Sequence, residues 1–213
     1  MPSPPPPKSR QSAYLARRRI ALLRSAQQVL ATSGPHATID EFAAVAGVSI
    51  ATLYKHFGSK DGLVAAALLD TQAGWEAWMN ATVSAVDDEL EQLVLSFRLL
   101  LRIGQTHPQT AQILARALAA GPVDLGLFNA DVVRRVMGLV AAGRITVEHV
   151  ELRLQQVLAG LLAEVARQMA SRQPNPAEGD VAVEIAISLL GITPAKARKL
   201  AHGKLPPLAP ALA

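Results

Sequence analysis

The sequence contains no cysteine, which excludes disulfide bonds, thiolate metal ligands and cysteine nucleophiles. Aromatic residues make up 4% of the 213 residues and charged residues 18%, whereas half are hydrophobic. A core must therefore be built mainly from Ala, Leu, Val and Ile, in one or two domains. No stretch reaches the roughly 18 uninterrupted apolar residues that a membrane helix needs, so we expect a soluble, cytoplasmic protein.

Charge is distributed unevenly along the chain. Residues 1–60 contain eight Lys and Arg against two acids, a net +6, whereas residues 61–195 contain nine against fifteen, a net −6. Four more Lys and Arg follow in residues 196–213. A basic N-terminal module joined to an acidic body indicates a polyanion partner for the first part alone.

Apolar spacing and capping signals predict helices throughout the chain and no sheet. Breaks at Gly and Pro divide them, and the expected helices cover residues 13–33, 39–46, 49–56, 59–81, 87–105, 108–120, 128–142, 146–172, 177–190 and 194–202. Proline-rich ends predict a disordered arm over 1–12 and a disordered tail over 203–213. The fold class is therefore all-α, with about nine or ten helices, the first three in a domain over 13–60 and the rest in a domain over 61–202.

The segment from Thr38 to Lys60 reads TIDEFAAVAGVSIATLYKHFGSK. Thr38 and Glu41 form a capping box, Gly47 suits the left-handed end of a helix, and Ser49 can cap the next short helix. Phe42, Ala46, Val48 and Leu53 lie at offsets that would hold two helices at a steep angle, with Ala43 as the small residue between them. This pattern predicts a helix-turn-helix, whose second helix enters the major groove of DNA.

The sequence AAVAGVSIATLYKHFGSKDGL over residues 43–63 resembles the N-terminal domain of the tetracycline-repressor (TetR) family of bacterial transcription regulators. The resemblance is close over about residues 13–65 and architectural beyond. It implies a helix-turn-helix DNA-binding domain, followed by a helical domain that binds a ligand and forms a dimer. No cofactor and no metal site are expected.

The resemblance and the chemistry of the side chains together predict the DNA contacts. Phosphate contacts are expected from Tyr54, His56 and Lys60, with Thr38 acting as a helix cap first and a phosphate contact second. Base readout is expected from Ser49, Ile50, Ala51, Thr52 and Lys55, with Ile50 suited to a thymine methyl group. Arg17, Arg18 and Arg19 are either a solvated helix face or further contacts to phosphate or the minor groove.

The body is expected to form a homodimer, because one short helix reads few bases and two copies could bind half-sites about 34 Å apart. In the resembling family the last two long helices form the interface. Apolar positions spaced by three and four residues predict it here, at Val150, Leu154, Val157, Leu161, Val165, Ile185 and Leu189. The alternative is that these helices simply close the core of one chain.

Polar and aromatic residues on otherwise aliphatic helices predict a small-molecule site in the body. The candidates are Trp75, Trp78, Phe97, Arg102, His107, Arg116 and Phe128, with Gln105, Gln112 and Asn129 as further polar positions. Each alone is as compatible with an ordinary surface or core position. The scarcity of aromatic residues favours a hydrophobic effector over one that needs stacked rings.

An enzyme is the main competing class, but the sequence has no phosphate-binding glycine loop, no Gly-x-Ser-x-Gly turn and no His-Glu-x-x-His helix. The remaining alternative is a helical interaction protein without sequence-specific DNA binding, which would have no need of the basic N-terminal end. We therefore expect a homodimeric repressor that binds a palindromic operator and is released by a small hydrophobic effector.

Overall fold

The structure, a computed structural model, describes residues 10–120, 125–171, 173–206 and 208, and of these the side chains of 10, 11 and 125–131 are not considered. Regular structure in the described residues is helical throughout, which confirms the all-α fold class. The chain separates into two compact units between Thr71 and Gln72. Most of the expected proline-rich arm and the end of the expected tail lie outside the described residues, and the described part of the arm, from Arg10, belongs to the first helix.

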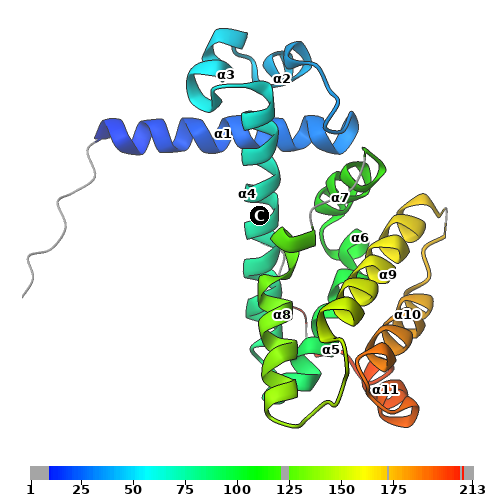
Figure 1. The fold of residues 1–213 in the computed structure, drawn as a ribbon. Helices are drawn as coiled ribbons and strands as arrows, with labels where there is room; N and C mark the ends of the chain where they lie inside the picture. The colour runs from blue at the N-terminus through cyan, green and yellow to red at the C-terminus, as the bar shows by residue number, and fades with distance from the viewer. Residues whose placement is uncertain (1–9, 121–124, 172, 207, 209–213) are drawn as a thin grey trace, which may run out of the picture. The chain divides into compact units, whose positions relative to one another are not determined.

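The first unit contains α1 (Arg10–Thr32), α2 (Ile39–Ala46), α3 (Ile50–Phe57) and the beginning of α4 (Lys60–Val83). Figure 1 shows α2 and α3 together on one side of the long α1. The capping box is present, because Glu41 N–H donates to the Thr38 hydroxyl and Thr38 N–H donates to the Glu41 carboxylate. The α2–α3 turn has Gly47 at φ 63°, the left-handed conformation that glycine adopts at little cost.

Side chains from α1, α2, α3 and α4 form the core of the first unit. Phe42 and Leu53 are each 1% exposed, and Ala43 is buried where α2 approaches its neighbours. Leu15 and Ile20, at the N-terminal end of α1, are 49% and 51% exposed. Burial on α1 begins at Leu22, since residues 12–21 are all exposed.

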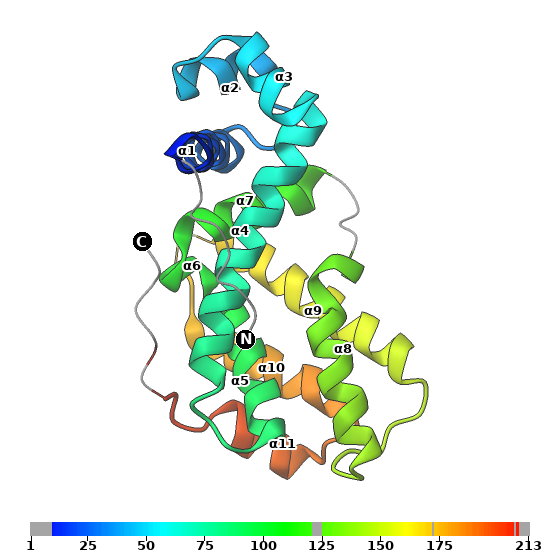
Figure 2. The same ribbon diagram turned by 90° about the vertical axis from the view of Figure 1, so that its left-hand side faces the viewer.

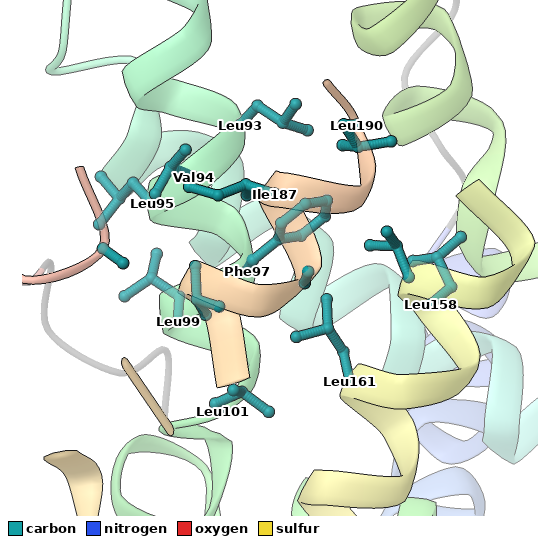
Figure 3. Packing of buried hydrophobic residues seen from close by; sticks show 14 of the residues in the cluster. Leu93, Val94, Leu95, Phe97, Leu99, Leu101, Leu158, Leu161, Ile187 and Leu190 are labelled. Atoms are coloured by element: carbon teal, nitrogen blue, oxygen red, sulfur yellow. The ribbon is translucent and has the colours of Figure 1, made fainter. Parts of the chain in front are cut away.

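The second unit consists of the rest of α4 and seven further helices, α5 (Glu89–Leu100), α6 (Ile103–Thr106), α7 (Pro108–Ala120), α8 (Leu125–Ala141), α9 (Val150–Ala170), α10 (Pro176–Leu189) and α11 (Pro194–Ala201). Helix α5 packs against α8, α9, α10 and α11, and Figure 2 shows the same helices from a second direction. Its Phe97 lies at the centre of the aliphatic cluster, near Leu158 and Leu161 of α9 and Ile187 of α10 (Figure 3).

The single helix expected over 87–105 is wrong, because it breaks into α5 and α6 around Leu101 and Arg102. The carbonyl of Arg98 accepts a hydrogen bond from the Arg102 side chain, and the Arg102 N–H bonds to Leu99 O instead. A side chain has thus replaced a backbone donor in the helical ladder. No Gly or Pro marks this break in the sequence.

The helix expected over 146–172 begins at Val150 instead. His149, at φ 53° and ψ 47°, takes a left-handed conformation in which an α-helix of L-residues does not continue. The preceding segment is held against the end of α10, where a Cβ on Gly191 would meet the carbonyl oxygen of Thr146. Packing between distant segments therefore prevents four residues from extending the helix.

A buried ion cluster joins α5 to α10 and to the C-terminal segment. Asp180 accepts hydrogen bonds from Arg98 Nε at 3.0 Å and Arg102 Nη2 at 2.8 Å, and Arg98 Nη1 donates to Gly203 O at 2.8 Å. Both arginine side chains are less than a tenth exposed. Burial raises the pKa of the Asp180 carboxyl, but the hydrogen bonds from Arg102 and Arg98 outweigh it and hold that pKa below its ordinary value.

We expect Asp180→Ala to lower the free energy of unfolding by about 3 kcal/mol, because it leaves two buried arginines without their counter-ion. In the wild type this contribution is present above the unfolded pKa, near 4, and is lost as the pH falls through the lower folded pKa. Denaturant unfolding at pH 7 and pH 3 measures both effects. Glu178 lies on α10 like Asp180, and Glu178→Ala, which removes an exposed ion pair with Arg167 of α9, should cost less than about 1 kcal/mol. Equal losses for the two variants would contradict a structural role for the cluster.

Candidate functional site

Helix α3 presents its N-terminal end to solvent. Ser49 caps the helix, since Thr52 N–H donates to its hydroxyl at 3.3 Å, and the two hydroxyl oxygens lie 3.0 Å apart. Ala51 is exposed, while Ile50 and Thr52 are half-buried. The predicted base-reading residues Ser49–Thr52 therefore lie in the first turn of one short helix. A first turn with small and hydroxyl side chains can approach the edges of base pairs closely.

Two of the predicted contacts project from the second half of α3. The Tyr54 side chain is 43% exposed, and Lys55 is exposed beside it. His56 is half-buried at the C-terminal end, and its ring lies 6.2 Å from that of Phe57. A phenol and an ammonium group in adjacent positions can donate hydrogen bonds to phosphate oxygens.

Lys60 and Thr38 lie on the flanks of α3, and both already have partners in the protein. The Lys60 ammonium donates to Ala37 O at 3.2 Å, close to the start of α2. The Thr38 hydroxyl donates to Glu41 Oε2 at 3.1 Å. Hydrogen bonds from the Thr38 backbone and hydroxyl lower the pKa of the Glu41 carboxyl. Thr38 therefore acts as a helix cap, as its sequence position indicates.

The three consecutive arginines of α1 have different surroundings. Arg19 Nη1 donates to His56 O at 3.1 Å, and its guanidinium carbon lies 4.6 Å from the centre of the Phe57 ring. It therefore fixes the C-terminal end of α3 against α1 through a carbonyl hydrogen bond and a cation–π contact. Arg17 and Arg18 are exposed. Sequence reasoning missed this role of Arg19, because the contact joins residues 37 positions apart.

The second unit brings three of the predicted effector residues together. The indole centroids of Trp75 and Trp78 on α4 lie 5.1 Å apart, and the His107 ring meets them edge-on at 5.2 and 4.6 Å. Both indoles are less than a tenth exposed. His107 Nδ1 is buried without a hydrogen-bond partner, and burial lowers the pKa of the imidazole. Burial therefore favours the uncharged form of this ring.

The other predicted effector residues do not join this cluster. Phe97 is 2% exposed in the aliphatic core, and Arg102 is bound in the ion cluster with Asp180. Arg116 is exposed on α7. Phe128 lies outside the residues whose side chains the structure describes. Arg98 and Arg102, two arginines four residues apart in an otherwise apolar stretch, are the sequence signal for a buried acidic partner such as Asp180.

The predicted dimer-interface residues fall into two groups. Leu154, Val157, Leu161 and Val165 are 1–3% exposed in the core of the single chain, and Val150 is half-buried against that core. They have little surface to offer to a partner. Ile185 and Leu189, in contrast, are 61% and 41% exposed on α10.

Further exposed apolar and small residues lie on α9 and, beside Ile185 and Leu189 in sequence, on α10, and these two helices pack against each other. Together we call these residues the α9–α10 face, and it consists of Leu152, Ala159, Gly160, Ala163, Val181, Ile185 and Leu189. On α10 these residues recur at intervals of four, so they form one stripe. Sequence periodicity alone could not tell this side of α9 from the buried side, because both carry small or apolar residues.

Two kinds of site are absent from the part of the chain that the structure describes. No three His, Asp or Glu side chains gather there as they would around a metal ion. In the same residues no helix combines the length and apolar character that crossing a membrane requires.

Comparison with known proteins bears on the first unit and on the whole fold. Residues 22–67 match the family model described as bacterial regulatory proteins, tetR family. The structure of RolR in complex with resorcinol is similar with a TM-score of 0.73 and 21% identity, covering 93% of this chain and 100% of that one. The structure of FadR from Bacillus subtilis in complex with stearoyl-CoA is similar with a TM-score of 0.68 and 17% identity, covering 82% of this chain and 99% of that one. The structure of a tetR-family transcriptional regulator from Pectobacterium atrosepticum is similar with a TM-score of 0.65 and 22% identity, covering 88% of this chain and 100% of that one. No curated protein matches the chain.

A helix-turn-helix with an exposed second helix, matched by the tetR-family model over residues 22–67, is a DNA-binding domain of the kind found in bacterial regulators, and a second helical unit follows it. Over residues 22–67 the chain is similar to the bacterial regulatory proteins of the tetR family. The match includes the residues that carried the resemblance in the sequence, from the buried half of α1 to the first turns of α4.

Proposed function

We propose that the protein is a repressor that binds a palindromic operator as a homodimer and is released by a small hydrophobic effector. The observation that supports it best is the exposed surface of α3, where Tyr54 and Lys55 project from a helix fixed in place by Arg19 and by a buried Leu53. Lys60 and the arginines of α1 add positive charge on the flanks. Phosphate contacts from the flanks would orient the first turn of α3 toward the bases.

The dimer in this proposal forms through the α9–α10 face of each copy. Three large apolar side chains of α10, Val181, Ile185 and Leu189, are 48%, 61% and 41% exposed in the single chain. Burying such a stripe against its own copy removes apolar surface from water. Ala159, Gly160 and Ala163 are small enough for two helices to approach closely. Two-fold symmetry of the dimer then explains a palindromic operator.

The effector in this proposal acts on helix α4. This helix begins at Lys60, three residues after the end of α3, and its later residues Trp78 and Val83 are buried in the core of the second unit. A ligand that repacks the second unit would therefore displace a helix that is continuous with the DNA-binding unit. A small displacement is enough to move a recognition helix out of register with its half-site.

Selection of bound sequences from a random duplex pool tests the proposal. We expect an inverted repeat with half-sites about one helical turn, roughly 34 Å, apart, because each copy of α3 reads one half-site. The same selection with Lys55→Ala should relax preference at one symmetric pair of positions. Recovery of unrelated sequences, or of a single half-site, would contradict a dimeric operator-binding protein.

A further inference from the structure

Helix α6 and the first turns of α7 border a groove on the surface of the second unit. The groove has a volume of about 240 Å³ and lies between these two helices and the C-terminal half of α9. Its walls are mainly apolar, and its polar groups come from glutamine side chains and one serine. The lining includes Ile103, Val165, Met169, Gln105, Gln112 and Gln168.

The lining of the groove contains no ionisable side chain. Gln168 is 8% exposed, and its amide nitrogen donates to Glu164 at 2.8 Å, which orients the amide. The amide carbonyl of Gln168 is then the part not engaged by Glu164, and it can accept a hydrogen bond. Gln105 and Gln112 at the exposed margin offer both donors and acceptors. Such a lining favours an uncharged ligand with a hydroxyl group, because a charge would lose its hydration without gaining a counter-ion.

The volume limits the size of the ligand. An apolar cavity of about 150 Å³ accommodates benzene, whereas sites for drug-sized ligands start at about 300 Å³. We propose that this groove binds a small uncharged molecule, about one substituted ring in size, with a hydroxyl group that the glutamine amides recognise. The proposal rests on the proposed function as a ligand-responsive regulator, and it gives that function a site and a ligand class.

His107 is not part of the lining, but it lies in sequence between the groove residues Gln105 and Pro108 and joins α6 to α7. His107 touches Trp75 and Trp78 of α4, and its buried Nδ1 has no hydrogen-bond partner. Ring packing, without a hydrogen bond at Nδ1, thus holds this edge of the imidazole. A ligand in the groove that shifts α6 or α7 would therefore move the imidazole against the two indoles.

The sequence contains two tryptophans, and both of them, Trp75 and Trp78, are in this cluster. Tryptophan fluorescence of the full-length protein therefore reports on the surroundings of these two indoles, which include the His107 ring. Calorimetry reports on binding itself, whether or not the indoles respond. Together the two measurements separate occupation of the groove from its effect on α4.

The test uses cyclohexanol and benzyl alcohol as probes, with cyclohexanecarboxylate and cyclohexylamine as charged counterparts. For the wild type without DNA we expect a dissociation constant on the order of 1 mM for each alcohol and at least tenfold weaker binding of each charged counterpart. A saturable change in tryptophan fluorescence should follow the same binding curve. Alcohol binding that is absent, or no tighter than that of the charged counterparts, would overturn the proposal.

Variants of helices α6 and α7 test whether the alcohols bind in this groove. Gln112→Ala should weaken alcohol binding about fivefold, whereas Gln109→Ala, on the same helix but outside the groove lining, should leave it unchanged. Gly104→Val should abolish binding, because a Cβ there lies 3.1 Å from Met169 Sδ and the larger side chain fills the groove. If Gly104→Val does not fold, as judged by circular dichroism, the glutamine pair decides the outcome. Equal affinities for Gln112→Ala and Gln109→Ala would place the binding elsewhere.

Operator binding distinguishes a failure of this proposal from a failure of the proposed function. If the wild-type protein binds its selected operator but no alcohol, the proposed ligand site is contradicted and the proposed regulatory function is not. If the wild-type protein binds the alcohols but no DNA, the proposed regulatory function is contradicted and the proposed ligand site is not. Alcohol binding by calorimetry with unchanged tryptophan fluorescence would overturn the route through His107.

Discussion

Replacing Ile185 by Glu is expected to convert the protein from a dimer into single, folded chains. Ile185 is the most exposed of the large apolar residues on α10, at 61%, so the substitution removes little from the core of one chain. In the proposed dimer it would bury a glutamate from each copy against apolar neighbours, which is costly for an unpaired charge. We expect the dimer dissociation constant to rise at least about 100-fold, or about 2.7 kcal/mol, as measured by sedimentation equilibrium.

The matched control is Ile20→Glu, the same exchange at a residue 51% exposed on α1 of the first unit. It should leave the dimer intact, because α1 is not part of the proposed interface. Both variants should melt within a few degrees of the wild type when the dimer contribution is allowed for. Dimers that persist in Ile185→Glu would remove the α9–α10 face as the interface, and with it the explanation of a palindromic site.

The double variant Tyr54→Phe, Lys60→Ala is expected to lose about 100-fold in operator affinity. In each copy the two replacements remove two proposed phosphate contacts, and two hydrogen bonds to a charged acceptor are together worth about 3 kcal/mol, so about 100-fold is the loss for one half-site. Loss of the Lys60 charge should also reduce the slope of log affinity against log salt by about 0.9 per copy. Fluorescence anisotropy of a labelled operator over a range of salt concentrations measures both quantities.

Lys199→Ala serves as the control for charge, since Lys199 is an exposed cation on α11 in the second unit. It should change neither the affinity nor the salt slope beyond about a factor of two. Lys60→Ala also removes a hydrogen bond to Ala37 O, so thermal unfolding of the double variant must be compared with that of the wild type. Wild-type affinity in a folded double variant would remove α3 as the DNA-reading element.

Local signals account for the elements that could be predicted. The capping box at Thr38 and Glu41, the left-handed Gly47 and the cap at Ser49 all act within a few residues, so the sequence alone defined α2, the turn and α3. The same holds for the limits of α7, which the structure gives as Pro108–Ala120, as expected. The helix-turn-helix and the family resemblance both follow from this local chemistry.

Signals that depend on distant partners were missed or misjudged. The break between α5 and α6 follows from the Arg102 side chain, whose position is set by Asp180 on α10. Arg19 was grouped with its neighbours because nothing in the sequence shows that it reaches Phe57. The aromatic candidates were separated in space, with Trp75 and Trp78 meeting His107 and Phe97 lying in the core.

The amino-acid sequence by itself determined the helical class, the capped and turned helices near the N-terminus and the basic character of that end, because these depend on neighbouring residues and on composition. Tertiary packing decided which side of α9 lies inside, which candidate residues meet and where a groove forms. An amphipathic period tells how a helix divides into faces, but only the other helices determine which face they cover.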